Sequence, residues 1–205
     1  MPWIRRSLWC GVGGAVSFVA LFLVNDRLKP NYDPIRDFVS EAAIGPGGWV
    51  QITNFLTVGA LLAFSSPALS RSVSRWTGRL VGIVGVGLVN AGVFVTDPVP
   101  HDRTTWHGIA HNVVSIVVFA SLSSACFTAS RWRPSLGWRV YSLATGMAVP
   151  VLFAAAVTVT TTSGLWQRAT ILVGWSWLAL LALRAIRLQL DQEDANPTGS
   201  RLAMP

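Results

Sequence analysis

Six long apolar runs, separated by short polar connections, constrain this chain of 205 residues more than any other feature. Each run is about 15 to 21 residues long and almost free of charge, close to the roughly 20 residues that a helix needs to cross a hydrocarbon core. Backbone groups in lipid must hydrogen-bond within their own element, so the runs predict helices rather than strands. The sequence therefore predicts an all-α fold, a six-transmembrane helix bundle, with spans at about residues 8–24, 49–66, 80–95, 107–128, 138–160 and 168–187.

The charged residues are distributed unevenly between the two ends of these spans. Eleven of the 16 lysines and arginines lie at the N-terminus, in the second and fourth connections, or near the C-terminus, whereas six of the nine acids lie in the first and third connections. Basic loops stay on the cytoplasmic side, so we expect both termini to be cytoplasmic and the odd-numbered connections to be extracytoplasmic, in the plasma (inner) membrane. Residues 1–188 then form one transmembrane domain, and the polar residues 189–205 form a disordered cytoplasmic tail.

The net charge of +7 raises the alternative of a nucleic-acid-binding protein. The arginines, however, lie at the ends of the apolar runs, where they face anionic lipid headgroups. We therefore expect membrane lipids, and not nucleic acid, as the partners of this chain.

All three histidines lie in one segment, residues 96–111, which reads TDPVPHDRTTWHGIAH. His107 and His111 are one helical turn apart, so both imidazoles project from one face, as two zinc ligands do in helix-based sites. They fall in the first turns of the fourth predicted helix, where the positive end of the helix dipole favours neutral imidazole, the form that binds metal. Asp97 and His101 lie just upstream and complete a candidate zinc site. The alternative is an interfacial polar network without metal.

The first connection is long for a compact protein, at 24 residues. Pro34 opens a short predicted helix, in which the spacing of Asp33, Asp37, and Ser40 or Glu41 places them along one side. One interpretation is an amphipathic interfacial helix that is capped by Asp33 and keeps its other charges in water. The other is that this helix folds over the histidine segment and forms one site with it.

Polar residues within the apolar runs fall at a matching depth. Asn90 in the third run shares a helical face with Asp97, and Ser115 in the fourth shares one with His111. Asn112 lies beside them in the chain. Polar groups inside a membrane normally face the interior of the bundle and mark sites or bonds between helices. We therefore add Asn90 to the candidate ligand-binding residues, with interhelical bonding as its structural alternative.

Two functional hypotheses follow, and the sequence leaves both open. In the first, the candidate zinc site activates water for the hydrolysis of a lipid or lipid-linked substrate at the outer interface. Asp37 or Glu41 then acts as the base and Ser40 orients the substrate. In the second, the protein is not an enzyme, and the same cluster forms a polar gate or binds a headgroup or a partner protein. Arg36 and Arg103 are suited to meet phosphate there.

Three short motifs accompany the six predicted helices: YDPIRDFVSE in the first connection, GVFVTDP at the end of the third run and HGIAH at the start of the fourth. In this combination the chain resembles the bacterial and archaeal membrane family named domain of unknown function 998, over nearly its whole length. The resemblance implies an integral membrane protein without an established activity. Matched to the motifs of that family, the corresponding positions are Asp33, Ser40, Glu41, Asp97, His107 and His111.

A more distant comparison is with the membrane hydrolases that include alkaline ceramidases, which use serine, aspartate and three histidines around zinc. The same residue types occur here as Ser40, Asp97, His101, His107 and His111. Those hydrolases have seven helices and a histidine pair near the C-terminus, so the comparison is an analogy and carries no residue roles.

Overall fold

The computed structural model describes residues 2–99, 104–132 and 135–195, and the described part contains helices and no strands. Each predicted span coincides with an α-helix that is long and apolar enough to cross a membrane, so the prediction of a six-helix bundle is confirmed. The third and fifth predicted spans, 80–95 and 138–160, each end two residues beyond the helix, at Val93 and Thr158. The six helices are α1 (Pro2–Leu28), α2 (Trp49–Ser72), α3 (Arg75–Val93), α4 (Trp106–Ala129), α5 (Leu136–Thr158) and α6 (Ser163–Ala195). Two short 3-10 helices, η1 (Val39–Ala43) and η2 (Thr160–Thr162), lie in the connections.

Helix caps explain why three helices begin before their apolar runs do. Ser74, Thr105 and Ser135 precede α3, α4 and α5, and each side-chain oxygen accepts a hydrogen bond from the backbone N–H three residues later. Such a bond satisfies one of the four N–H groups that a helix start leaves without a partner. An estimate from hydropathy alone therefore places the start of α3 and of α5 too late.

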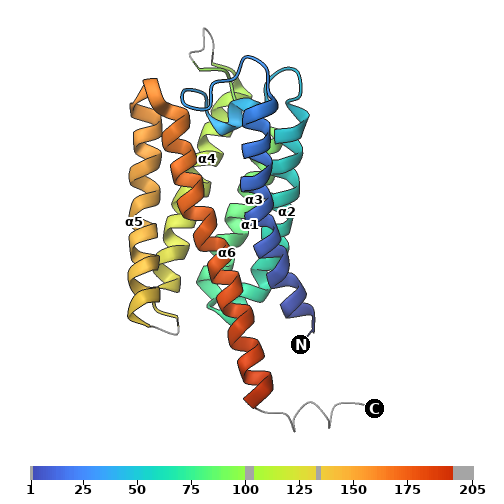
Figure 1. Ribbon diagram of the computed structural model, residues 1–205, viewed down its shortest axis with the longest axis vertical. Coiled ribbons are helices and arrows are strands. Elements are labelled where there is room, and N and C mark those ends of the chain that lie inside the picture. Colours follow the sequence, from blue (N-terminus) through green and yellow to red (C-terminus); the bar gives the residue numbers. More distant parts are fainter. Residues whose placement is uncertain (1, 100–103, 133–134, 196–205) are drawn as a thin grey trace.

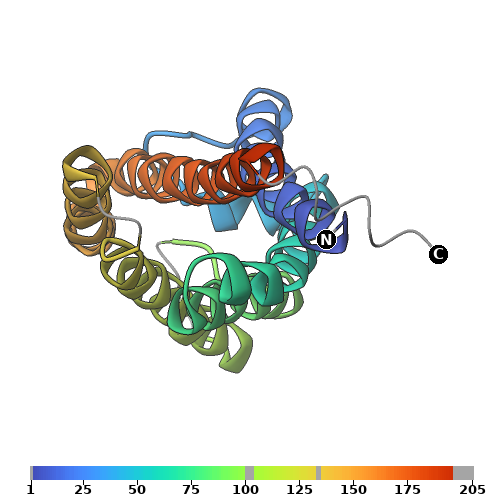
Figure 2. The same cartoon turned by 90° about the horizontal axis from the view of Figure 1, so that it is seen from below.

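The helices form a closed ring in chain order. Each helix packs against the next, and α6 returns to pack against α1 (Figures 1 and 2). The start of α1 and the end of α6 lie at one end of the bundle, which we call the terminal end. The connections that follow α1, α3 and α5 lie at the other, which we call the loop end. Which of the two is cytoplasmic remains a prediction from the charge distribution.

Aromatic side chains fill the centre of the ring. The ring of Trp175 on α6 stacks on Phe18 of α1, with centroids 5.0 Å apart, and lies 6.3 Å from Phe119 of α4. The ring of Phe55 on α2 also contacts Phe18, with centroids 5.7 Å apart. These contacts join four helices below the loop end, and all four rings line a small chamber of about 30 Å³ there.

Helix α6 is longer than a membrane span requires. Its 33 residues reach about 50 Å, against a hydrocarbon core of about 30 Å, and it projects beyond the other helices at the terminal end (Figure 1). It continues to Ala195, so residues 189–195 are helical where the composition predicts a disordered tail. Gln189 donates a hydrogen bond to Ser72 on α2, at 2.9 Å, which anchors this extension. Residues 196–205 of the predicted tail lie outside the described residues.

Candidate site at the loop end

Residues 34–37 form a turn, which corrects the expectation of a short helix opened by Pro34. The carboxylate of Asp33 accepts a bond from the N–H of Ile35, and that of Asp37 accepts one from the N–H of Asp33. These side chains therefore satisfy backbone groups locally, and the chain turns back instead of continuing as a helix. The side chain of Arg36 is exposed on this turn.

The turn is fixed by backbone bonds to the start of α6. The N–H of Gly164 donates to the carbonyl of Arg36, at 3.1 Å, and the N–H of Leu165 donates to that of Ile35, at 3.0 Å. A Cβ atom on Gly164 would collide with the carbonyl oxygens of Asp37 and Pro34. The absence of a side chain at this position is what lets the turn approach the helix so closely.

Glu41 joins the first connection to the histidine segment. One carboxylate oxygen accepts a bond from the N–H of Phe38, and the other accepts one from the N–H of Val99, both at 2.7 Å. The residue is only 8% exposed, and this burial raises the pKa of its carboxyl group, while the two N–H donors oppose the shift. The first connection therefore contacts the histidine segment directly, through the bond between Glu41 and Val99, as one of the two interpretations of this connection expects.

A buried ion pair that the sequence does not suggest lies beside this turn. Arg168 on α6 makes a two-pronged bond to the carboxylate of Asp26 at the end of α1, at 2.7 and 2.8 Å. It also donates to the hydroxyl of Tyr32 and to the backbone carbonyls of Asp37 and Gly164. Both charged side chains are less than a tenth exposed. Asp26 and Arg168 are 142 positions apart in the chain, and no spacing rule relates them.

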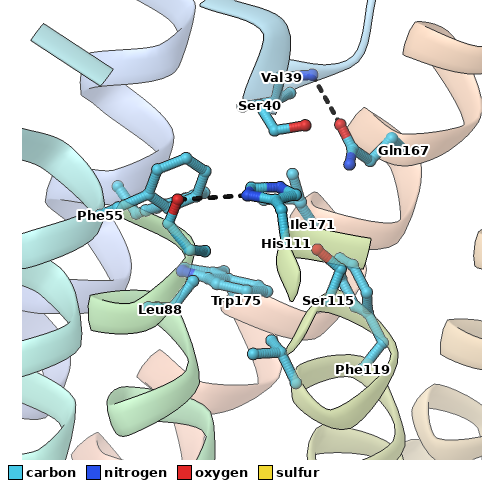
Figure 3. Close-up of a pocket in the computed structure, with 13 residues that line it drawn as sticks. Val39, Ser40, Phe55, Leu88, His111, Ser115, Phe119, Gln167, Ile171 and Trp175 are labelled. Atoms are coloured by element: carbon cyan, nitrogen blue, oxygen red, sulfur yellow. Dashed lines mark hydrogen bonds between the residues drawn. The ribbon is translucent and has the colours of Figure 1, made fainter. Parts of the chain in front are cut away.

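The two described histidines both use Nδ1 to bind backbone. Nδ1 of His107 lies 2.8 Å from the carbonyl oxygen of Val95, and Nδ1 of His111 lies 2.7 Å from that of Phe94 and 3.2 Å from that of Ala91. A carbonyl oxygen only accepts, so Nδ1 carries the proton in each ring, and Nε2 of the neutral ring is an acceptor. His111 is 3% exposed and points into the bundle (Figure 3).

Asp97 is held at the start of α4. Its carboxylate accepts bonds from the backbone N–H and the hydroxyl of Thr105, at 2.8 and 2.6 Å. Thr105 is the N-cap of α4, so Asp97 fixes the cap that begins the histidine helix. A Cβ atom on Gly108 would collide with this carboxylate, so the first turn of α4 requires glycine at that point.

A cavity of about 460 Å³ lies between η1, α4, α5 and α6, and we call it the loop-end cavity. A smaller chamber of about 30 Å³ lies below it, large enough for a water molecule, with Trp175 and Phe18 in its lining. The two spaces share four polar lining residues: Ser40, His111, Ser115 and Gln167. Figure 3 shows these side chains around one space, with those of Ser40 and Gln167 above the imidazole of His111.

The four shared residues leave hydrogen-bonding groups unused. Gln167 accepts a bond from the N–H of Val39 through its oxygen, at 2.6 Å. Within the described part of the chain, no bond is found for its amide nitrogen, for the hydroxyls of Ser40 and Ser115, or for Nε2 of His111. Buried polar groups are normally paired, so a cavity lined by several such groups is suited to a polar ligand or water. No motif or spacing in the sequence indicates Gln167 as a site residue.

The remaining candidates are not brought to this cavity. Asn90 lies on a groove formed by α2, α3 and α4, where its amide donates to the carbonyl of Val86, at 2.8 Å. His107 and Arg36 are not among the residues that line the cavity. His101 and Arg103 lie outside the described residues.

No three His, Cys, Asp or Glu side chains converge as metal ligands among residues 2–99, 104–132 and 135–195. Asp97 and His111 both line the loop-end cavity, whereas His107 does not. The candidate zinc site includes His101, which is not described, so zinc binding stays a prediction.

The comparisons with known proteins agree with the fold and give no activity. Neither the curated proteins nor the solved structures contain a match to the chain. A family model described as "Protein of unknown function (DUF998)" matches residues 12–184, which includes most of α1 and α6, the four helices between them and both connections of the candidate site. The chain therefore belongs to the family of integral membrane proteins of unknown function called DUF998.

Proposed function

We propose that this protein binds an amphiphilic molecule, a membrane lipid or a lipid-like compound, in the loop-end cavity. The observation that carries the proposal is the division of the cavity lining into two parts. Ser40, His111, Ser115 and Gln167 supply polar groups at its inner side, whereas Ile116, Phe153 and Val157 supply an apolar side between α4 and α5. Four more polar residues belong to the lining: Thr96, Asp97, Thr104 and Asn112. A mostly apolar cavity with a few convergent polar groups is typical of a small-molecule site.

The cavity reaches the outer surface of the bundle between α4 and α5. Ile116 on α4 and Val157 on α5 line it and are 58% and 54% exposed. In a transmembrane helix, apolar side chains that are exposed in this way face lipid tails. An acyl chain can therefore lie between α4 and α5 while the polar group of the same molecule occupies the inner side.

The lining favours a polar group that donates hydrogen bonds. Nε2 of His111 accepts, the serine hydroxyls both donate and accept, and Asp97 adds a carboxylate to the same lining. A carboxylate disfavours a second anion nearby. The preferred headgroup is thus one with hydroxyl or amine groups, and the expected ligand is a neutral or amine-bearing lipid.

Native mass spectrometry of the full chain in a mild detergent tests this proposal. Diacylglycerol and phosphatidylethanolamine serve as probes, with Ser115→Phe to fill the cavity and His111→Gln to remove the imidazole. We expect at least one probe to stay bound to the wild type. Its affinity for each variant should be about tenfold lower, which corresponds to the loss of at least one good hydrogen bond. Asn90→Ala is the matched control, because Asn90 lies on another groove. Equal binding by the wild type and Ser115→Phe would overturn the proposal.

A zinc-dependent hydrolase is the second candidate, favoured by the orientation of the histidine rings. His107 and His111 both donate through Nδ1 to backbone carbonyls, as metal-binding histidines commonly do, and this orientation leaves Nε2 for an ion. Asp97 or His101 would supply a further ligand, and Ser40 would orient the substrate. The carboxylates of Asp37 and Glu41, the candidate bases, already accept backbone bonds.

Metal analysis of protein prepared without chelators separates the two candidates. Stoichiometric zinc that is lost in the double variant His107→Ala, His111→Ala would support the hydrolase. Protein without bound metal that still retains a lipid probe would leave the binding function alone standing and overturn the zinc site.

The charge distribution supports an extracytoplasmic loop end, in the plasma (inner) membrane. A cysteine at Thr104, which is exposed, tests this sidedness. We expect an impermeant maleimide to label Thr104→Cys from outside intact cells. The wild type, whose Cys10 and Cys126 lie within helices, provides the background. Labelling only after the cells are opened would reverse the topology.

A further inference from the structure

A second cavity, of about 490 Å³, lies at the opposite end of the bundle between α5 and α6. The function proposed above does not use it. Its lining combines two arginines with aromatic and aliphatic side chains: Trp138, Tyr141, Leu180, Leu183, Arg184 and Arg187.

The two arginines share one face of α6. Arg184 and Arg187 are three residues apart, a spacing that brings side chains together on a helix. The guanidinium of Arg184 lies over the rings of Trp138 and Trp132, at 5.2 and 5.8 Å from their centroids. Such stacking holds the flat face of a guanidinium, while its N–H groups donate in the plane of the group. The cavity therefore has a positioned guanidinium and, in Arg187, a second exposed one.

No acidic residue lines this cavity within the described part of the chain. Asp191, one turn beyond Arg187 on α6, is not among the lining residues. The described lining of the cavity thus carries a positive charge. Guanidinium groups favour phosphate in particular, because their paired N–H groups match two of its oxygens.

The aliphatic part of the lining extends from the arginines toward the middle of the bundle. Leu180 lies one turn before Arg184 on the same face of α6, and Leu183 lies beside it. Trp138 and Tyr141 on α5 complete the wall at a level where tryptophan and tyrosine are typical of the membrane–water interface. A lipid with a charged headgroup and an acyl chain has the same division of polar and apolar parts.

We propose that this cavity binds an anionic glycerophospholipid, with its phosphate at Arg184 and Arg187 and an acyl chain along Leu180 and Leu183. Basic pockets between transmembrane helices are known to hold such headgroups. This site is independent of the loop-end cavity, and the lipid class differs, because the loop-end lining contains a carboxylate and this lining contains two cations.

Native mass spectrometry of the full chain with phosphatidylglycerol or phosphatidylcholine tests the site. We expect the wild type to prefer phosphatidylglycerol and the double variant Arg184→Gln, Arg187→Gln to bind it at least about tenfold more weakly, since each arginine contributes about fivefold. The matched control is Arg71→Gln, Arg75→Gln. It removes the same charge at the same end, and Arg71 also stacks on an indole, that of Trp3, at 4.8 Å. The control should change affinity by less than about twofold.

Single variants keep the test decisive if the double variant is unstable. Arg187 is exposed, so Arg187→Gln should fold normally and still lose about fivefold. Equal losses of phosphatidylglycerol affinity in the two double variants would show only a diffuse attraction between basic residues and anionic lipid, and would overturn the site. Equal binding of the two lipids would overturn it as well. Full displacement of phosphatidylglycerol by inorganic phosphate would identify a soluble anion as the ligand instead.

Discussion

Two polar clusters at the loop end differ in how completely their hydrogen-bonding groups are used. Arg168 has five N–H donors, and each has a partner on Asp26, Tyr32, Asp37 or Gly164. Around the loop-end cavity, by contrast, the hydroxyl of Ser40 has no bond among the described residues. A fully paired cluster holds helices and loops together, whereas a cluster with unused groups is prepared for a ligand.

The difference follows from what each cluster connects. Arg168 lies where α6, the end of α1 and the first connection meet, and its bonds fix all three. Among the residues of the cavity, Gln167 and His111 are each held through one group, by the backbone of Val39 and of Phe94. Their second groups face the cavity and contribute little to the fold. Substitutions should therefore separate the two clusters, with stability lost at one and ligand binding lost at the other.

The largest effect is expected at Arg168. Arg168→Ala leaves the carboxylate of Asp26 buried without its partner, which should lower the free energy of unfolding by about 3–5 kcal/mol. Denaturant titration of the detergent-solubilised protein measures the change. Arg27→Ala, at an exposed neighbour of Asp26, is the control. The double variant Asp26→Asn, Arg168→Gln tests the cause. If its loss of unfolding free energy equals the sum of the losses in the two single variants, the ion pair is not the source of the effect.

A smaller loss of stability is expected at the start of the histidine helix. Gly108→Ala forces the carboxylate of Asp97 away from Thr105, and the strain and lost bonds should cost about 1–3 kcal/mol. The same titration measures it. Gly137→Ala is a matched control, because a Cβ atom at Gly137, in the first turn of α5, meets nothing within 4 Å. Equal effects of the two substitutions would point to helix propensity instead of the contact with Asp97.

Glu41 lies between the two clusters and should show a dependence on pH. Glu41→Gln removes one accepting oxygen, so one of the two N–H groups loses its partner at a cost of about 1 kcal/mol. Burial raises the pKa of the folded carboxyl above its ordinary value of 4.5. The folded state then binds the proton more tightly than the unfolded chain does, so stability should fall as pH rises between the two pKa values.

The unfolding free energy of the wild type minus that of Glu41→Gln, followed from acid to neutral pH, isolates this contribution. The difference should decrease as pH rises above 4.5 and level off beyond the folded pKa. An increase over the same range would show that the two backbone donors, and not burial, dominate the titration.

The smallest change in stability is expected at Ser40, together with a loss of lipid binding. Ser40→Ala removes a hydroxyl for which no bond is found among the described residues, so stability should change by less than about 0.5 kcal/mol. Binding of the diacylglycerol or phosphatidylethanolamine probe should weaken by about fivefold, the effect of one hydrogen bond. A loss of stability similar to that of Gly108→Ala would remove the distinction between the two clusters.

The sequence predicted more of the architecture than of the site. Six apolar runs sufficed for six helices, because a membrane requires long apolar segments with internally paired backbones. The sequence also indicated that Ser40, Asp97, His111 and Ser115 belong to one region, and all four line the loop-end cavity. It did not indicate that Asp33 and Asp37 bond backbone groups in a turn, because local capping competes with helix formation in a way that spacing does not reveal.

The sequence by itself determined the fold class, the helix number and the end of the bundle at which the polar residues gather, since hydropathy acts along the chain. Only the tertiary structure decided the pairing of Asp26 with Arg168, the bond that the N–H of Val99 donates to Glu41 and the approach of Gln167 to His111. It also separated Asn90 from the cavity. The physical reason is that closure of the ring brings α6 back to α1. Which side chains then meet depends on the rotation and the register of each helix. The packing of many other side chains along the helices sets that rotation and register.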